Sequence, residues 1–181
     1  MQIKETPLKG CYILQPQLFV DGRGSFFESF NKKQFRDITG KNIDFIQDNQ
    51  SRSKKGVLRG LHYQKGEHAQ AKLVRVVKGR VQDVVVDLRF NSKTFGNHFS
   101  IELSEENNTQ LFVPRGFAHG FLVLEDNTIF SYKCDNFYNK DAESGIIYND
   151  EDLDINWNIL ENDFIISEKD LKLPKYRVVD L

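Results

Sequence analysis

A series of short segments, each bounded by turn residues, constrains the fold of this chain most strongly. The clearest pair is Lys72–Lys78, which alternates as Lys-Leu-Val-Arg-Val-Val-Lys, and Val81–Leu88, joined at Gly79 and Arg80. A period of two is typical of strands, and the short link predicts that the pair forms a hairpin. Further strands are predicted at Tyr12–Phe19, Ser25–Phe30, Phe45–Asn49, Gly56–His62, His98–Leu103, Leu111–Val113, Gly120–Leu124 and Thr128–Cys134. Such spacing is typical of an all-β sandwich or barrel.

Aromatic content and two capping signals complete the predicted architecture. The chain contains 15 phenylalanines, six tyrosines and one tryptophan, which favour strands. Asn31 can cap a short helix over Lys32–Ile38, and Ser167–Asp170 reads as a second capped helix. No repeat, low-complexity tract or linker divides the sequence. We therefore expect one mainly β domain over residues 1–181, with a few short peripheral helices.

Charge and cysteine usage exclude several broad classes. The formal net charge is -1, from 25 basic and 26 acidic residues, so general binding to nucleic acid or to a membrane surface is not expected. No apolar run approaches the roughly 20 residues that a membrane helix needs, and the first residues lack the apolar core of a signal peptide. Cys11 and Cys134 have no metal-binding spacing, which favours free thiols in a reducing compartment. These features predict a cytoplasmic protein.

The first candidate for chemistry is Leu-Arg-Gly-Leu-His, in which Arg59 and His62 lie three positions apart. In a regular strand these two side chains would point to opposite faces. A kink or bulge at Gly60 would let them converge. A cation beside a histidine suits an anionic substrate that must also gain or lose a proton.

A second candidate is Pro114-x-Gly116-x-x-His119, which places a histidine just after a tight turn. Together with the His62 segment it resembles the two halves of the signature of cupins, jelly-roll proteins that often bind a metal. The His-x-His of metal-binding cupins is missing, and Lys72 lies where a metalloenzyme would keep a carboxylate. A lysine there would repel a dication. We therefore expect no metal and no cofactor.

At this level of detail the chain resembles the dTDP-4-dehydrorhamnose 3,5-epimerase family, cofactor-free cupins that act on sugar nucleotides. The resemblance is carried by ordered motifs along nearly the whole chain, at Phe19–Phe30, Gln47–Ser51, Gly56–Gln64, Ala71–Val76, Val113–Phe121, Tyr132–Asp135, Gly145–Asp150 and Ile155–Trp157. It implies a cupin-type jelly roll and epimerisation at C3 and C5 of a dTDP-linked 4-keto-6-deoxyhexose. Both carbons flank a ketone, so a general base can remove their protons once the oxyanion is stabilised.

The resemblance also implies a role for each catalytic residue. His62 would be the base and Tyr132 the acid on the opposite face of the sugar. Asp170 would orient the imidazole and stabilise its protonated form, as a carboxylate does in a catalytic triad. Lys72 would stabilise the enolate near the sugar O4. On periodicity alone Tyr132 is a core tyrosine, and Asp170 is a residue of a helical first turn.

Substrate-binding residues follow from the same resemblance. Arg23 and Arg59 would bind the diphosphate, because arginine pairs bidentately with phosphate oxygens. His119 and Arg59 would bind the sugar–phosphate end of the substrate. Further contacts to the nucleotide are implied for Phe26, Glu28, Gln47, Asn49, Tyr138, Glu143 and Lys169. In the family, some N-terminal residues reach the site of a partner, so the resemblance implies a homodimer with shared sites.

Three other functions remain open at this point. An epimerase acting at C3 or C5 alone, on a related nucleotide-linked 4-ketosugar, would use the same acid and base. A metal-dependent cupin is disfavoured by Lys72 and by the missing His-x-His. A non-catalytic sugar-binding cupin would keep Arg59 and the aromatic residues without needing Tyr132 or Asp170.

Overall fold

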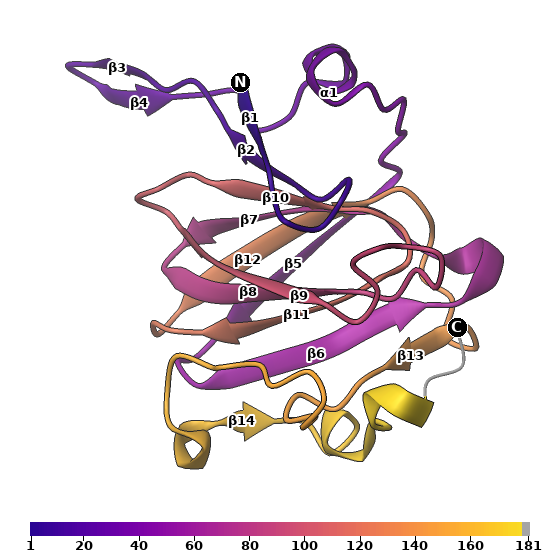
Figure 1. Cartoon of the computed structure of the whole chain (residues 1–181). Helices are drawn as coiled ribbons and strands as arrows, with labels where there is room; N and C mark the ends of the chain where they lie inside the picture. The colour runs from indigo at the N-terminus through magenta and orange to yellow at the C-terminus, as the bar shows by residue number, and fades with distance from the viewer. Residues whose placement is uncertain (179–181) are drawn as a thin grey trace.

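The computed structural model describes residues 1–178, and two sheets packed face to face form the body of the fold (Figure 1). The first sheet contains, in spatial order, β1 (Gln2–Glu5), β2 (Tyr12–Gln15), β10 (Gln110–Val113), β7 (Lys72–Lys78), β12 (Thr128–Cys134) and β5 (Gln47–Ser53). The second contains β13 (Glu143–Gly145), β6 (Val57–Gln64), β11 (Phe117–Val123), β8 (Arg80–Asp87) and β9 (His98–Ser104), with β14 (Ile165–Ile166) beside β6. This arrangement confirms the predicted mainly β, jelly-roll fold.

The remaining elements are short. A separate hairpin, β3 (Phe19–Asp21) with β4 (Gly24–Phe26), projects from the body of the molecule at the upper left of Figure 1. The one α-helix within residues 1–178 is α1 (Lys32–Thr39), where Asn31 accepts a hydrogen bond from the Gln34 amide as the predicted N-cap. Single 3₁₀ turns occur at η1 (Gly66–His68), η2 (Glu161–Asp163), η3 (Asp170–Lys172) and η4 (Tyr176–Val178).

The predicted hairpin between β7 and β8 is wrong, because the two strands belong to different sheets. β7 pairs with β10 and β12, whereas β8 pairs with β11 and β9. The chain crosses between sheets at Gly79, whose φ is +77° and whose position leaves only 2.3 Å between an added Cβ and Thr128 Oγ1. A side chain would not fit there, so the tight crossing requires glycine.

Strand limits differ from the predictions where a polar or proline residue intervenes. Lys72–Lys78 and Thr128–Cys134 are confirmed as strands with the predicted ends. The strand predicted over Tyr12–Phe19 is broken near Pro16, and the one predicted at Phe45–Asn49 instead covers Gln47–Ser53. The second is shifted because β5 is a polar edge strand, which an apolar pattern does not reveal.

Other segments of the chain cover part of the outer face of each sheet. Between the sheets lies a core that includes Val74, Val85 and Phe130. α1 and the N-terminal segment cover the outer face of the first sheet around Phe35. The segment after β13 covers the second sheet, where it contacts Val84. The interior between the sheets is apolar at one end and polar at the other, where the candidate site lies.

Candidate active site

The alternation of β6 changes phase at Gly60, which brings Arg59 and His62 to the same cavity. Leu61 and Tyr63 belong to the outer apolar cluster, so His62 points inward between them. Arg59 also points inward, and the register with β11 shifts between His119 and Phe121. An added Cβ at Gly60, where φ is +115°, would lie 2.7 Å from Gly120 Cα. The predicted bulge is therefore confirmed, and it depends on glycine at this close approach of two strands.

His62 is oriented by a carboxylate from the far end of the described chain. Its Nε2 lies 2.7 Å from Asp170 Oδ1, while Asp170 Oδ2 accepts a hydrogen bond from the Gly60 amide at 3.3 Å. Burial of the Asp170 carboxyl raises its pKa, but the hydrogen bonds from His62, Gly60 and Ser167 outweigh this and lower it below 3.8. Asp170 therefore stays ionised, and His62 Nδ1 is left as the nitrogen that can accept a proton.

Tyr132 and Lys72 face His62 from the opposite sheet. They lie on β12 and β7, and the Lys72 Nζ is 5.9 Å from the centre of the Tyr132 ring. Burial raises the pKa of Tyr132, so its phenol remains protonated at neutral pH. Burial also lowers the pKa of Lys72, against the opposing effects of Cys134, Asp83 and Glu143. These two groups can supply a proton and a positive charge in the same cavity.

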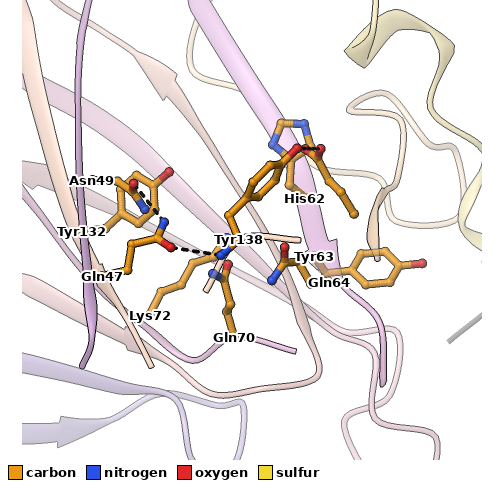
Figure 2. A pocket seen from close by; sticks show the side chains of 10 residues that line it. Gln47, Asn49, His62, Tyr63, Gln64, Gln70, Lys72, Tyr132 and Tyr138 are labelled. Atoms are coloured by element: carbon orange, nitrogen blue, oxygen red, sulfur yellow. Dashed lines mark hydrogen bonds between the residues drawn. The ribbon is translucent and has the colours of Figure 1, made fainter. Parts of the chain in front are cut away.

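Two adjoining cavities open between the sheets. The wider, about 270 Å³, is bordered by Gln47, Asn49, His62, Tyr63, Gln64, Gln70, Lys72, Tyr132, Tyr138 and Glu143 (Figure 2). The narrower, about 170 Å³, is bordered by Gln50, Ser51, Arg59, His62, Lys72, His119, Phe121 and Tyr132. His62, Lys72 and Tyr132 line both. A ligand that spans the two cavities would therefore pass between the candidate base and the candidate acid.

His119 forms a second histidine–carboxylate pair at the narrower cavity. Its Nε2 lies 2.9 Å from Oδ2 of the fully buried Asp83, and its ring stacks near Phe130. Sequence reasoning missed Asp83. The sequence could have indicated this residue, because it is an acidic residue within the valine-rich segment Val81–Val86, where a buried charge needs a partner.

The predicted nucleotide-side residues form a hydrogen-bonded rim around the wider cavity. Gln47 donates to Asn49 Oδ1 and accepts from the Tyr138 amide, both contacts drawn in Figure 2. Tyr138 donates its hydroxyl hydrogen to Glu143 at 2.6 Å, and Lys169 Nζ lies 2.5 Å from the same oxygen. Burial raises the pKa of Glu143, but the hydrogen bonds from Lys169 and Tyr138 outweigh it and leave the pKa below 4.5.

Sequence reasoning missed a residue that supports this rim. Gln64 donates to the carbonyl oxygens of His68 and Phe137 and accepts from the Asn139 amide. These bonds fix the loop that carries Tyr138. A signal existed, because Gln64 follows His62 by two positions on the same strand.

Three predicted residues lie away from both cavities of their own chain. Arg23 and Phe26 belong to the projecting β3–β4 hairpin, and Glu28 follows it. The Arg23 side chain is 90% exposed and pairs with Asp21, and Phe26 is 66% exposed. Glu28 bonds only Asn31 and Gln34 among residues 1–178. The structure therefore does not bring these three together with the other site residues within one chain.

Neither a metal cluster nor a membrane helix is found in the part of the chain that the structure describes. No group of three or more His, Cys, Asp or Glu side chains is placed to hold a metal ion there. None of the helices over residues 1–178 has the length and apolar character needed to cross a membrane. Cys11 and Cys134 are buried and unpaired, as predicted.

Comparisons with known proteins agree with this geometry. The sequence model of the dTDP-4-dehydrorhamnose 3,5-epimerase family matches residues 5–177. The enzyme of that name from Escherichia coli K12 is 49% identical over 173 residues, covering 96% of this chain and 93% of its own. The crystal structure of the Elizabethkingia anophelis enzyme is 58% identical, with a TM-score of 0.95 and coverage of 98% and 97%.

A third relative was solved with a bound sugar nucleotide. The 3,5-epimerase from Legionella pneumophila, in complex with dTDP-4-keto-L-rhamnose, is 43% identical, with a TM-score of 0.95 and coverage of 99% of this chain and 94% of its own. Identity, coverage and fold agree along almost the whole chain, so this protein belongs to the dTDP-4-dehydrorhamnose 3,5-epimerase family.

Proposed function

We propose that this protein epimerises dTDP-4-dehydro-6-deoxy-D-glucose at C3 and C5, giving dTDP-4-dehydro-L-rhamnose. The observation that carries the proposal is that His62 and Tyr132 extend from opposite sheets into the same two cavities, together with Lys72. Inversion of a carbon needs a base on one face and an acid on the other. These side chains provide both, beside a cation that can stabilise the intermediate.

Each inversion proceeds in two proton transfers. His62 Nδ1 takes the proton from the carbon next to the ketone, and the electron pair of the broken C–H bond forms the enolate, whose charge lies on O4. The ammonium of Lys72 stabilises that oxyanion, and it does so strongly because the cavity is partly shielded from water. Tyr132 then donates its proton to the opposite face of the carbon, and solvent restores both side chains. The same two steps at the second carbon complete the reaction.

In this proposal the nucleotide binds in the wider cavity and the hexose lies towards the narrower one. Gln47, Asn49, Tyr138, Glu143 and Lys169 form the rim that would hold the nucleotide, and Tyr138 offers an aromatic face to the base. Arg59 and His119 line the narrower cavity and would bind the sugar end. This orientation presents C3 and C5 between His62 and Tyr132.

Deuterium exchange tests the reaction directly. With dTDP-4-keto-6-deoxyglucose in D₂O and no added metal, we expect deuterium at both C3 and C5, resolved by NMR. Exchange at one carbon only would instead assign a single-position epimerase. Absence of exchange at both carbons, with folded protein, would reject the proposal. Running the uridine analogue alongside measures the preference for thymine.

Tyr132→Phe tests the acid separately. The variant keeps the ring and loses the hydroxyl, so we expect dTDP affinity close to that of the wild type and turnover lower by roughly 10²-fold or more. Turnover equal to that of the wild type would show that another group donates the proton.

The active form is proposed to be a homodimer in which the β3–β4 hairpin of one protomer completes the site of the other. The hairpin supports this because it exposes Phe19, Val20 and Phe26 and carries Arg23 away from its own cavities. Mixing inactive Arg23→Ala and His62→Asn proteins tests it. After subunit exchange in an equal mixture, about half of the dimers are heterodimers, and each of these has one intact site and one defective site. The mixture would therefore recover up to roughly one quarter of wild-type activity. No recovery after subunit exchange would show that Arg23 acts within its own chain.

A cytoplasmic location is proposed as well. The buried, unpaired thiols of Cys11 and Cys134 support it, because such thiols persist in reducing compartments.

A further inference from the structure

The polar edge strand β5 contains Ser51, which borders the narrower cavity and has no role in the function proposed above. Gln47, Asn49, Ser51 and Ser53 face inward on this strand and alternate with the more exposed Asp48, Gln50 and Arg52. Gln47 bonds Asn49, Asn49 donates to Cys134 Sγ, and Ser53 accepts from Arg59. Ser51 Oγ is buried and has no hydrogen-bond partner among residues 1–178.

The surroundings of Ser51 make a serine unfavourable for packing. Ser51 lies directly opposite Phe130 on β12, and Phe130 stacks on Phe121 with 4.1 Å between ring centres. A hydroxyl beside aromatic rings loses its hydrogen bonds to water without gaining others. Alanine would remove that cost, so stability alone does not explain a serine at this position.

The wall of the narrower cavity, which Ser51 lines, is rich in hydrogen-bond donors. Arg59, Lys72 and the protonated Tyr132 are donors along this wall. Sugar hydroxyls donate as well as accept. A serine hydroxyl adds a neutral group that can accept a hydrogen bond from a sugar hydroxyl and donate one in return.

We propose that Ser51 is a substrate-binding residue that hydrogen-bonds a hydroxyl of the hexose. The inference rests on the proposed function, because it takes the narrower cavity as the place of the sugar. On this proposal Ser51 contributes to the binding of the hexose. It does not contribute to the binding of the nucleotide, because the proposed nucleotide-binding groups line the wider cavity.

Binding measurements can test this without turnover. dTDP-glucose has no ketone and cannot be epimerised, so calorimetric titration with dTDP-glucose and with dTDP isolates the contribution of the hexose. We expect Ser51→Ala to weaken dTDP-glucose binding roughly three- to tenfold, the usual effect of one neutral hydrogen bond, and to leave dTDP binding unchanged. Equal affinity of variant and wild type for dTDP-glucose, or the same loss for dTDP, would overturn the assignment.

Three companion measurements separate this role from a structural one. Ser51→Cys replaces the hydroxyl by a somewhat larger thiol that accepts hydrogen bonds only weakly, so it should lose hexose affinity as Ser51→Ala does. Both variants should melt at or above the wild-type temperature, and a clear drop would identify a structural serine. Arg52→Ala, one residue away on the outer face, should change neither affinity. Failure of the epimerase proposal would appear separately, as absent deuterium exchange in the wild type.

Discussion

Two histidines border the narrower cavity, each is paired with an aspartate, and the two pairs differ in their access to solvent. His62 lies 2.7 Å from Asp170, and His119 lies 2.9 Å from Asp83. The His62 side chain is 30% exposed, whereas that of His119 is 6% exposed. This difference in exposure is why we propose His62, and not His119, as the base that exchanges protons with solvent.

The two aspartates also come from different kinds of structure. Asp83 lies in the middle of β8, and its Oδ1 has no hydrogen-bond partner among residues 1–178. Asp170 begins η3 in the segment that covers the second sheet, and it bonds both His62 and the Gly60 amide. A hydrogen-bonded histidine is thus not by itself a base. Solvent access and a fully bonded carboxylate distinguish the pair that can cycle a proton.

The largest effect should come from replacing the accessible histidine. His62→Asn removes the base, so we expect kcat to fall roughly 10²- to 10⁴-fold and exchange at C3 and C5 to fall with it. His119→Asn should cost roughly tenfold or less, mainly in KM, because it removes a binding contact. Steady-state rates and melting temperatures of both variants provide the measurement. Equal losses in kcat would remove the distinction between the pairs.

Replacing the two aspartates should also affect kcat unequally, with a larger loss for Asp170 than for Asp83 and smaller losses than for His62. Asp170→Asn removes a charge-assisted hydrogen bond to the imidazolium, which corresponds to a loss in kcat of about 10- to 150-fold. Asp83→Asn should change kcat at neutral pH less than tenfold and lower the free energy of unfolding by ~1–3 kcal/mol, because it disturbs a buried pair. Denaturant unfolding and turnover of both proteins test this. A larger kcat loss in Asp83→Asn would reverse our assignment.

The alkaline side of the pH–rate profile should respond to Asp83 and not to Asp170. Burial holds the pKa of Lys72 below 10.5, and the Asp83 carboxylate is among the charges that oppose this decrease. Asp83→Asn should therefore lower that pKa further and move the alkaline limb of kcat/KM to lower pH. Burial raises the pKa of Tyr132 above 10.0, and Asp83 is not among the charges that shift it. An unchanged limb in Asp83→Asn would mean that Lys72 is not the group titrating.

The smallest effect concerns stability in acid. Although burial raises the pKa of Asp170, its hydrogen bonds lower it below the unfolded value of 3.8. The ionised carboxylate therefore stabilises the fold fully above pH 3.8, and this contribution is lost as pH falls through the folded pKa. The difference in melting temperature between wild type and Asp170→Asn should narrow below about pH 4. A constant difference would show that the carboxylate contributes no charge-dependent stability.

Much of the local structure follows from residue order. The alternation in Lys72–Lys78 and Thr128–Cys134 specifies strands with the observed ends, and Asn31 specifies the start of α1. Gly60 marks the change of phase that brings Arg59 and His62 together. These features depend on the conformations that a few neighbouring residues can adopt, so a short window of sequence contains the information.

The sequence pattern did not determine which strands pair with each other. Gly79 looks like a hairpin turn, yet β7 and β8 pair in separate sheets. Alternation predicts which face of a strand is buried, but it does not predict which strand lies beside it.

By itself the sequence determined the strand-rich fold, the change of phase at Gly60 and, through its family motifs, the identity of the proposed acid and base. The family motifs also implied that Asp170 orients His62. Only the tertiary structure decided the 2.7 Å contact between them, the pairing of Asp83 with His119, and the position of Arg23 away from its own cavities. The physical reason is that backbone conformation depends on near neighbours. Contacts between distant segments depend on how two whole sheets and their covering segments bury apolar surface together.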